Sequence, residues 1–123
     1  MRTAKLLALA LVLLSPLACG DDADSLGVGA ACSTSDDCND EQTCLAFKGG
    51  YCGVADCVGD DDCPVDSACV AHDDGNNYCF RLCSGKDDCN ANRSEDDEAN
   101  CSSSVTFVDA SNDAKKACVP PSA

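Results

Sequence analysis

Twelve of the thirteen cysteines fall into three groups of four, and this spacing constrains the chain more than any other feature. In every group, five residues separate the first two cysteines, and the last two of the five are Asp-Asp. The groups are Cys32, Cys38, Cys44 and Cys52; Cys57, Cys63, Cys69 and Cys79; and Cys83, Cys89, Cys101 and Cys118. The repetition predicts a small disulfide-rich fold built from three tandem four-cysteine modules.

The stretch between the third and fourth cysteine of each group has the pattern of a short β-hairpin. Apolar arms flank Gly49-Gly50 in the first group and Asp74-Gly75 in the second, and such pairs favour tight turns. In the third group we expect the arm 105–108 to be followed by a polar turn at 111–113. Each module is therefore predicted to be an acidic loop plus a hairpin. The modules cover residues 32–56, 57–82 and 83–118, the last with insertions, and 119–123 form a tail.

Four cysteines in one module can pair in three ways. The third and fourth flank the hairpin, so we expect each of them to bond a cysteine of the acidic loop. We favour first with third and second with fourth, and the insertions leave the pairing in the third group open. The pairs predicted for the first two groups are Cys32–Cys44, Cys38–Cys52, Cys57–Cys69 and Cys63–Cys79.

The recurring Asp-Asp pairs are interpreted as turn caps. Asp side chains accept hydrogen bonds from nearby backbone N–H groups and so favour tight turns. A five-residue loop that must reverse within a short span needs such caps. A metal site at paired carboxylates is the alternative. The pairs are Asp36-Asp37, Asp61-Asp62 and Asp87-Asp88.

Composition explains why the chain needs bridges. Of the 105 residues 19–123, only 14 are Leu, Val or Phe, and none is Ile or Trp. That share is below the roughly 20% under which an acidic chain is expected to be disordered, whereas the Cys content marks a disulfide scaffold. Disulfides persist in oxidising compartments, so we expect an exported protein.

The N-terminus has the order of a secretory signal, and we assign residues 1–18 to a signal peptide. Arg2 and Lys5 precede the apolar run Leu6–Leu14, which is too short to span a bilayer. The small residue Ala18 precedes Cys19. An uncleaved membrane anchor is the alternative. Residues 19–31 are predicted to be a modified cysteine followed by a flexible tether, because 20–31 are small and acidic.

Ala18 and Cys19 resemble the processing site of a bacterial lipoprotein, which implies that Cys19 is lipidated and anchors the chain in the cell envelope or at the outer surface. Lipidation also explains the odd thirteenth cysteine. Ordinary signal cleavage, with Cys19 left as a thiol or disulfide partner, is the alternative.

The stretches "CSTSDDCNDEQTC" and "CVGDDDCPVDSAC" resemble the N-terminal cysteine-rich module of Dickkopf proteins and, more loosely, the whey acidic protein four-disulfide core. The third group shares only "CSGKDDC". The resemblance implies extracellular modules that bind protein.

The charge of the chain restricts its partners. Residues 19–123 carry 22 acidic and 6 basic side chains, a net charge of −16. Nucleic acid and anionic headgroups would be repelled, whereas a cationic protein or ligand would be attracted. The alternative is that the charge only keeps a loop-rich surface soluble.

The sequence predicts neither a catalytic residue nor a cofactor. The one histidine, His72, is expected in an exposed turn, and a single His without a free Cys does not form a nucleophile and base pair. The cysteines are spaced too widely for structural zinc. Weak calcium binding by acidic stretches stays open as an alternative, although none forms the twelve-residue loop. The acidic run Glu95–Glu98 is expected to be a solvated loop.

The leading hypothesis is an exported, membrane-anchored lipoprotein that acts as a non-catalytic binding or structural module. The alternative is a secreted protease inhibitor with a disulfide-framed loop, in which Lys48 of "AFKGG" would enter a trypsin-like pocket.

Overall fold

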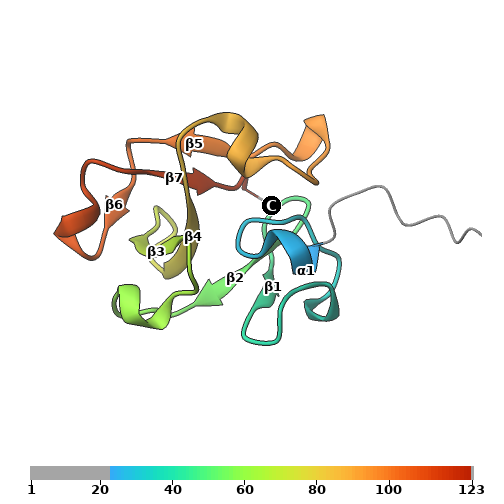
Figure 1. Cartoon of the computed structure of the whole chain (residues 1–123), viewed down its shortest axis with the longest axis horizontal. Coiled ribbons are helices and arrows are strands. Elements are labelled where there is room, and N and C mark those ends of the chain that lie inside the picture. Colours follow the sequence, from blue (N-terminus) through green and yellow to red (C-terminus); the bar gives the residue numbers. More distant parts are fainter. Residues whose placement is uncertain (1–22, 123) are drawn as a thin grey trace, which may run out of the picture.

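The computed structural model describes residues 23–122, which form a small, disulfide-rich and mostly antiparallel β fold (Figure 1). Short strands are interspersed with one-turn helical segments. The strands are β1 (Thr43–Leu45), β2 (Tyr51–Ala55), β3 (Ser67–Ala71), β4 (Asn77–Cys83), β5 (Asn100–Ser102), β6 (Thr106–Phe107) and β7 (Lys116–Val119). The helical segments are α1 (Ala23–Leu26) and the 3-10 turns η1 (Ser35–Asp37), η2 (Asp60–Asp62), η3 (Lys86–Cys89), η4 (Glu95–Asp97) and η5 (Ala110–Asn112).

The third and fourth cysteines of each group face each other across an antiparallel strand pair. β1 pairs with β2, β3 with β4, and β5 with β7. In the first hairpin Gly49 and Gly50 adopt φ values of 77° and 71°, which a side chain would disfavour. The cysteines that face each other are Cys44 and Cys52, Cys69 and Cys79, and Cys101 and Cys118.

Six disulfides connect these strands to the acidic turns, and every one closes within its own group. The four pairs predicted for the first two groups are confirmed, and the third group follows the same order. The bridged Cα atoms lie 5.4 to 5.9 Å apart, in the usual range for a disulfide. The pairs are Cys32–Cys44, Cys38–Cys52, Cys57–Cys69, Cys63–Cys79, Cys83–Cys101 and Cys89–Cys118.

The hairpin expected in the third group differs from the one observed. The arm 105–108 does not pair with the chain that follows the polar turn. Its strand β6 instead pairs with β3 of the second group, with Val70 opposite Phe107. Phe107 is buried there, and this burial of an aromatic side chain favours the pairing with β3.

Strands of different cysteine groups also pair with one another. β2 of the first group pairs with β4 of the second, and β4 pairs with β7 of the third. Together with the β3–β6 pair, these contacts join all seven strands. The three groups therefore share one sheet.

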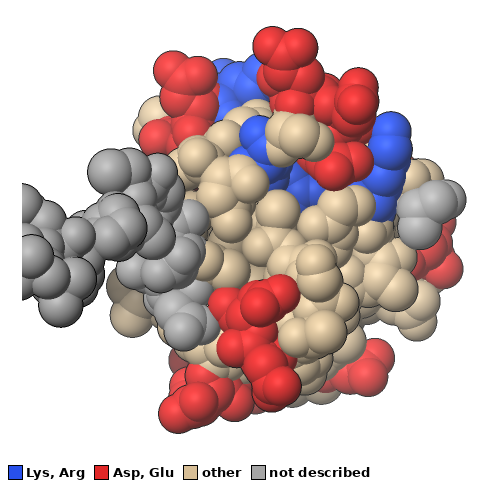
Figure 2. Space-filling model, turned by 90° about the vertical axis from the view of Figure 1, so that its right-hand side faces the viewer, with Lys and Arg blue, Asp and Glu red and all other residues tan. Residues whose placement is uncertain are grey.

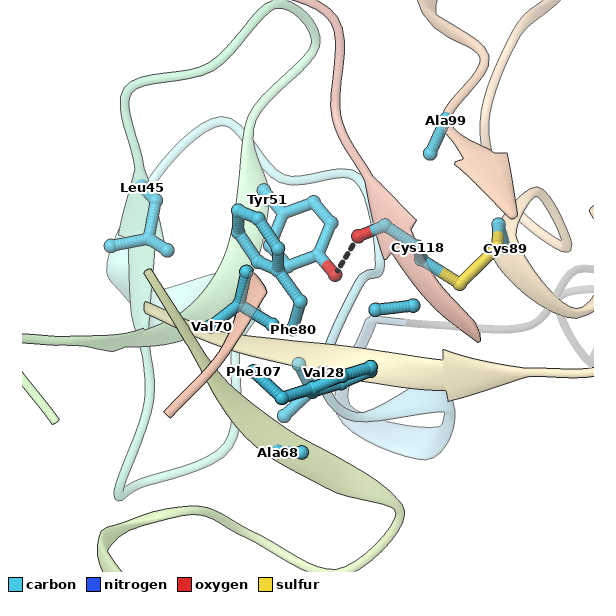
Figure 3. Close-up of a cluster of buried hydrophobic side chains, with 11 residues drawn as sticks. Val28, Leu45, Tyr51, Ala68, Val70, Phe80, Cys89, Ala99, Phe107 and Cys118 are labelled. Atoms are coloured by element: carbon cyan, nitrogen blue, oxygen red, sulfur yellow. Dashed lines mark hydrogen bonds between the residues drawn. A yellow bond between two sulfur atoms is a disulfide. The ribbon is translucent and has the colours of Figure 1, made fainter. Parts of the chain in front are cut away.

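The central core cluster is buried between segments of all three groups (Figure 3). The Tyr51 and Phe80 rings are fully buried, with centroids 5.2 Å apart. The Tyr51 hydroxyl donates to the Cys118 carbonyl (2.8 Å) and accepts from the Arg81 N–H (3.0 Å). Burial holds the pKa of this hydroxyl well above its usual value, so it stays protonated and keeps both bonds.

The segment expected to be a flexible tether is ordered over residues 23–31. Ala23, Val28 and Ala30 are buried. The Gly29 N–H donates to the Cys52 carbonyl, and the Cys52 N–H donates to the Ala30 carbonyl. This corrects the tether prediction for residues 23–31, which belong to the folded unit; residues 19–22 lie outside the described part.

The insertion of the third group docks against the first hairpin, although we expected a solvated loop. Arg93 is buried, and its guanidinium donates to the carbonyls of Lys48, Gly50 and Asp97, each at 2.7 Å. Burial lowers the pKa of Arg93. Glu95 remains exposed, but the insertion as a whole is held by this arginine.

Replacing Tyr51 with Phe should lower the free energy of unfolding by about 1–3 kcal/mol, because the buried Cys118 carbonyl and Arg81 N–H lose their partner. Denaturant unfolding with the disulfides intact measures the change.

Tyr78 provides the matched control. Its hydroxyl donates to the exposed carboxylate of Asp74 (2.7 Å), so Tyr78→Phe should change the free energy by less than about 0.5 kcal/mol. Equal losses in the two variants would contradict the central role of the Tyr51 hydroxyl.

Candidate interaction surface

The second Asp of each acidic pair caps its own turn, which confirms the interpretation as turn caps. Asp37 Oδ2 accepts from the N–H groups of Ser33 (2.9 Å) and Thr34 (3.2 Å). Asp88 Oδ2 accepts from Ser84 (2.8 Å) and Gly85 (3.2 Å). In the second group, Asp62 Oδ2 accepts from Val58 (2.9 Å).

These bonds favour the charged form of the carboxylate. The Ser33 and Thr34 N–H groups lower the pKa of Asp37, and the Ser84 and Gly85 N–H groups lower that of Asp88. The first Asp of each pair is exposed and contributes charge to the surface. The turn needs one carboxylate, and the other is left for solvent or a partner.

In the first two groups, the third residue of the five-residue loop makes a contact that the sequence analysis did not predict. Ser35 Oγ accepts from the Cys44 N–H, and Asp60 Oδ1 accepts from the Cys69 N–H, both at 3.1 Å. Each therefore fastens its turn to the strand that carries the third cysteine. In the third group this position is Lys86, which pairs with Glu98 instead. In the sequence, only the hydrogen-bond acceptors Ser35 and Asp60 at the same loop position indicated this contact.

The three acidic turns do not form a common cation site in the described residues. Within 23–122, the sets of three or more potential metal ligands that lie close together are cysteines. All of these cysteines are already bonded in disulfides.

Three valines stand out on the surface of the part of the chain that the structure describes. Val58 is 81% exposed, Val65 is 88% exposed and Val108 is 38% exposed. All three lie on or against the loop that the Cys57–Cys69 bridge closes, because the Val108 N–H donates to the Cys69 carbonyl (2.9 Å). We call Val58, Val65 and Val108 the distal valine surface.

The loop that carries Val58 and Val65 is hydrogen-bonded to the segment that follows β6. Asp109, next to Val108, accepts the Asp60 N–H through Oδ2 (2.9 Å). The buried Asn112 donates through its side-chain amide to Asp60 Oδ2 (2.5 Å). Asp60 thus joins η2 to the segment after β6. In Figure 1, β6 lies at one end and α1 lies toward the other.

The backbone around Val65 is also held in place. The Ser67 N–H and hydroxyl both bond the Pro64 carbonyl, at 3.2 and 2.6 Å. Asp66 has a φ of 65°, a conformation that Asp tolerates better than most residues, and its carbonyl accepts from the Leu82 N–H (2.8 Å). The exposed valine is therefore presented by an ordered loop.

Acidic side chains accompany the valines. Asp61 and Asp62 of η2 and Asp66 beside Val65 are exposed. Exposed valines and several exposed carboxylates therefore share one loop, which two disulfides hold.

His72 is not the exposed turn residue that we expected. It follows β3, is half-buried, and packs edge-to-face against Phe47 and Phe80, with ring centroids 5.6 and 5.3 Å apart. Tyr78 packs against it in the same way at 5.9 Å. The histidine thus contributes to the aromatic cluster beside the core.

Lys48, the residue on which the inhibitor hypothesis depends, is held by its neighbours. Its ammonium group donates to the Asp96 carbonyl (2.8 Å), its N–H to the Pro121 carbonyl (3.3 Å), and its own carbonyl accepts from Arg93. A protease-binding loop presents a free side chain and an accessible carbonyl. Lys48 is exposed, but its ammonium group and its carbonyl are both hydrogen-bonded within the protein.

Comparison with known protein families, curated proteins and solved structures gave no match. Cys19, the predicted lipidation site, lies outside the described residues. No helix between residues 23 and 122 combines the length and apolarity that a membrane span requires. The six disulfides are typical of an exported protein.

The Asp88 cap should be lost in acid. Because its folded-state pKa lies below the ordinary 3.8, the cap is fully present above pH 3.8 and disappears as the pH falls through the lowered value. In NMR titrations the Ser84 and Gly85 amide shifts should move with a midpoint below 3.8.

The neighbouring residue supplies the control for this titration. Asp88→Asn should abolish the transition at both amides, whereas Asp87→Asn should leave it in place. A transition that survives Asp88→Asn would assign the cap to another carboxylate.

Proposed function

We propose that this chain is an exported, membrane-anchored lipoprotein that acts as a non-catalytic binding module. Its partner is a protein with a basic, partly apolar surface, and the contact is the distal valine surface. The exposure of Val58 and Val65 beside carboxylates on an ordered loop carries the proposal. We also propose that the three cysteine groups are tandem modules of one design, since each combines a capped acidic turn, a strand pair and the same order of bridges.

The apolar part of the surface argues for a protein partner. The chain has few large apolar residues, and the cores bury most of them. Leaving two valines almost fully exposed forgoes burial worth about 1.5 kcal/mol or more for each. Contact with a partner would recover it. Because the loop is already ordered, binding would cost little conformational entropy.

The charge determines which partner would be favoured. A net charge of −16 over residues 19–123 repels nucleic acid and attracts cationic surfaces. Exposed carboxylates beside the valines would steer a basic protein toward them and discriminate against acidic ones. Solubility alone would explain the charge but not the exposed valines.

The membrane anchor is supported by the cysteine count. Twelve of the thirteen cysteines are bonded to one another, and Cys19 is the remaining one. It follows a sequence that resembles a lipoprotein signal. Lipidation gives this cysteine a role that leaves no free thiol in an oxidising compartment.

The protease-inhibitor alternative has less support. Its best candidate, Lys48, gives both its ammonium group and its carbonyl to bonds within the protein. Inhibition of a trypsin-like protease that is lost on Lys48→Ala would nevertheless reinstate it.

Lipidation predicts a specific mass. The mature chain extracted from membranes should begin at Cys19 and carry acyl chains, more than one of which is needed for stable anchoring. Intact-mass spectrometry measures this directly. Cys19→Ser should release the chain from the membrane fraction; a mature wild-type chain that starts elsewhere and lacks lipid mass would contradict the proposal.

Binding can be tested with a designed amphipathic Lys/Leu helical peptide as a probe of the proposed partner chemistry. Val58→Ser and Val65→Ser should each weaken binding about tenfold, because a buried valine contributes about 1.5 kcal/mol. Ala91→Ser, at an exposed residue on the α1 side, is the control and should bind as the wild type does. Isothermal titration calorimetry at low and at high salt measures the affinity of the peptide for each variant and for the wild type.

Two results would count against this surface. If both valine variants bind as tightly as the wild type while salt abolishes binding, attraction by net charge alone is responsible. If Ala91→Ser weakens binding as much as the valine variants do, the contact lies elsewhere.

A further inference from the structure

We propose that residues 23–31, which we call the N-terminal arm, fix the orientation of the protein on the membrane. The α1 side lies against the lipid headgroups, and the distal valine surface faces away from the bilayer. This inference rests on the proposed lipidation of Cys19, and it adds a second contact surface, for lipid, at the opposite end from the proposed protein contact.

The N-terminal arm pairs with the first hairpin through its backbone. The Gly29 N–H donates to the Cys52 carbonyl (2.8 Å), and the Cys52 N–H donates to the Ala30 carbonyl (2.9 Å). Cys52 is itself bonded to Cys38 and fully buried. The arm is therefore attached to a part of the chain that cannot move without breaking the core.

Side chains from the other two cysteine groups hold the same arm. Arg81 of β4 donates through Nη1 to the Leu26 carbonyl (2.5 Å) and lies 3.4 Å from that of Val28. From the third group, Asn92 bonds both the N–H and the carbonyl of Ala31, at 2.9 and 3.3 Å. Residues from all three cysteine groups therefore hold the arm between Leu26 and Ala31.

Burial adds to these bonds. Ala23, Val28 and Ala30 are 8%, 3% and 4% exposed. Ala23 is the first described residue, and its side chain already packs against the buried Cys52 cluster. The arm is thus held against the core from Ala23, which is four residues from Cys19 in the sequence.

The distance that the chain can span from Cys19 to Ala23 is short compared with the diameter of the protein. Four residue steps span at most about 14 Å when fully extended. A small domain is about 30 Å across. A lipidated Cys19 therefore keeps the α1 side within about 14 Å of the headgroups, whereas the distal valine surface approaches them only if the molecule lies flat on the bilayer.

The surface on the α1 side suits this position. Figure 2 views the molecule from the right-hand side of Figure 1, the side on which α1 lies, and shows an uncharged band with acidic groups below it and a mixture of acidic and basic groups above it. This band suits contact with zwitterionic headgroups better than with a negatively charged leaflet, because α1 itself contains Asp24.

A single introduced tryptophan can report the orientation, because the chain has no Trp. Asn39→Trp places it near the arm, since a Cβ added at Gly27 would lie 3.9 Å from the Asn39 side-chain nitrogen. Val58→Trp places it on the distal valine surface. Both positions are exposed. Each lipidated full-length variant is incorporated into phosphatidylcholine vesicles that contain headgroup-nitroxide lipid, and quenching of Trp fluorescence is measured.

Asn39→Trp should be quenched several-fold more strongly than Val58→Trp. The matched control inserts a Gly/Ser linker of about twelve residues after Asp22, with an r.m.s. length of about 20 Å. In that background the ratio of the two quenching constants should fall toward one, because the longer linker lets the protein turn over.

The outcomes separate this inference from the proposed anchor. Equal quenching at the two positions with the native linker, on protein that carries lipid and floats with the vesicles, overturns the orientation and leaves the anchor standing. A chain that gains no lipid mass and does not float with the vesicles overturns both.

Discussion

The structure depends on a crossed pair of disulfides that ties each acidic turn to a pair of strands. In the second group Cys69 and Cys79 face each other on β3 and β4, and they bond the two cysteines that bracket η2. The turn is thereby held against the strands at both of its ends. A chain with so few large apolar residues cannot offset its conformational entropy by burial alone. Bridges that restrict the unfolded chain, each worth about 2–4 kcal/mol, make up the difference.

The disulfides within each group do not hold the three groups together. A few specific contacts between the groups do. Tyr51 of the first group bonds Arg81 of the second and Cys118 of the third through a single hydroxyl. Arg93 of the third group holds the turn of the first hairpin. With the strand pairs β2–β4 and β4–β7, these contacts set the relative positions of the three groups. The proposed functions of the two ends depend on that rigidity, since a protein contact at one end and a membrane contact at the other require a fixed distance between them.

The sequence predicted the local features well and the contacts between groups poorly. Apolar arms around turn residues indicated the strand pairs of the first two groups, and the cysteine order indicated four of the bridges, because the loops involved are short and leave few geometries. The capping role of Asp37, Asp62 and Asp88 followed from the ordinary behaviour of Asp in turns. The pairing of β6 with β3, the docked arm 23–31 and the buried Arg93 carry no local pattern: each depends on a partner far away along the chain. Arg93 stands beside an acidic run, and the arm is made of small residues, so both resembled solvated segments. The distal valine surface could not be foreseen, because exposure is a property of the assembled fold.

Amide hydrogen exchange on the oxidised and the fully reduced chain tests the central role of the bridges most directly. Oxidised protein should show slowly exchanging amides in β3 and β4, whose strand pair carries two of the cysteines in the crossed bridges. Full reduction should abolish that protection near room temperature, and a Cys63→Ser, Cys79→Ser variant should lose it first in those two strands. If the reduced chain kept slow amides in β3 and β4, burial rather than the disulfides would hold the fold, and the dependence of the structure on its crossed bridges would be refuted.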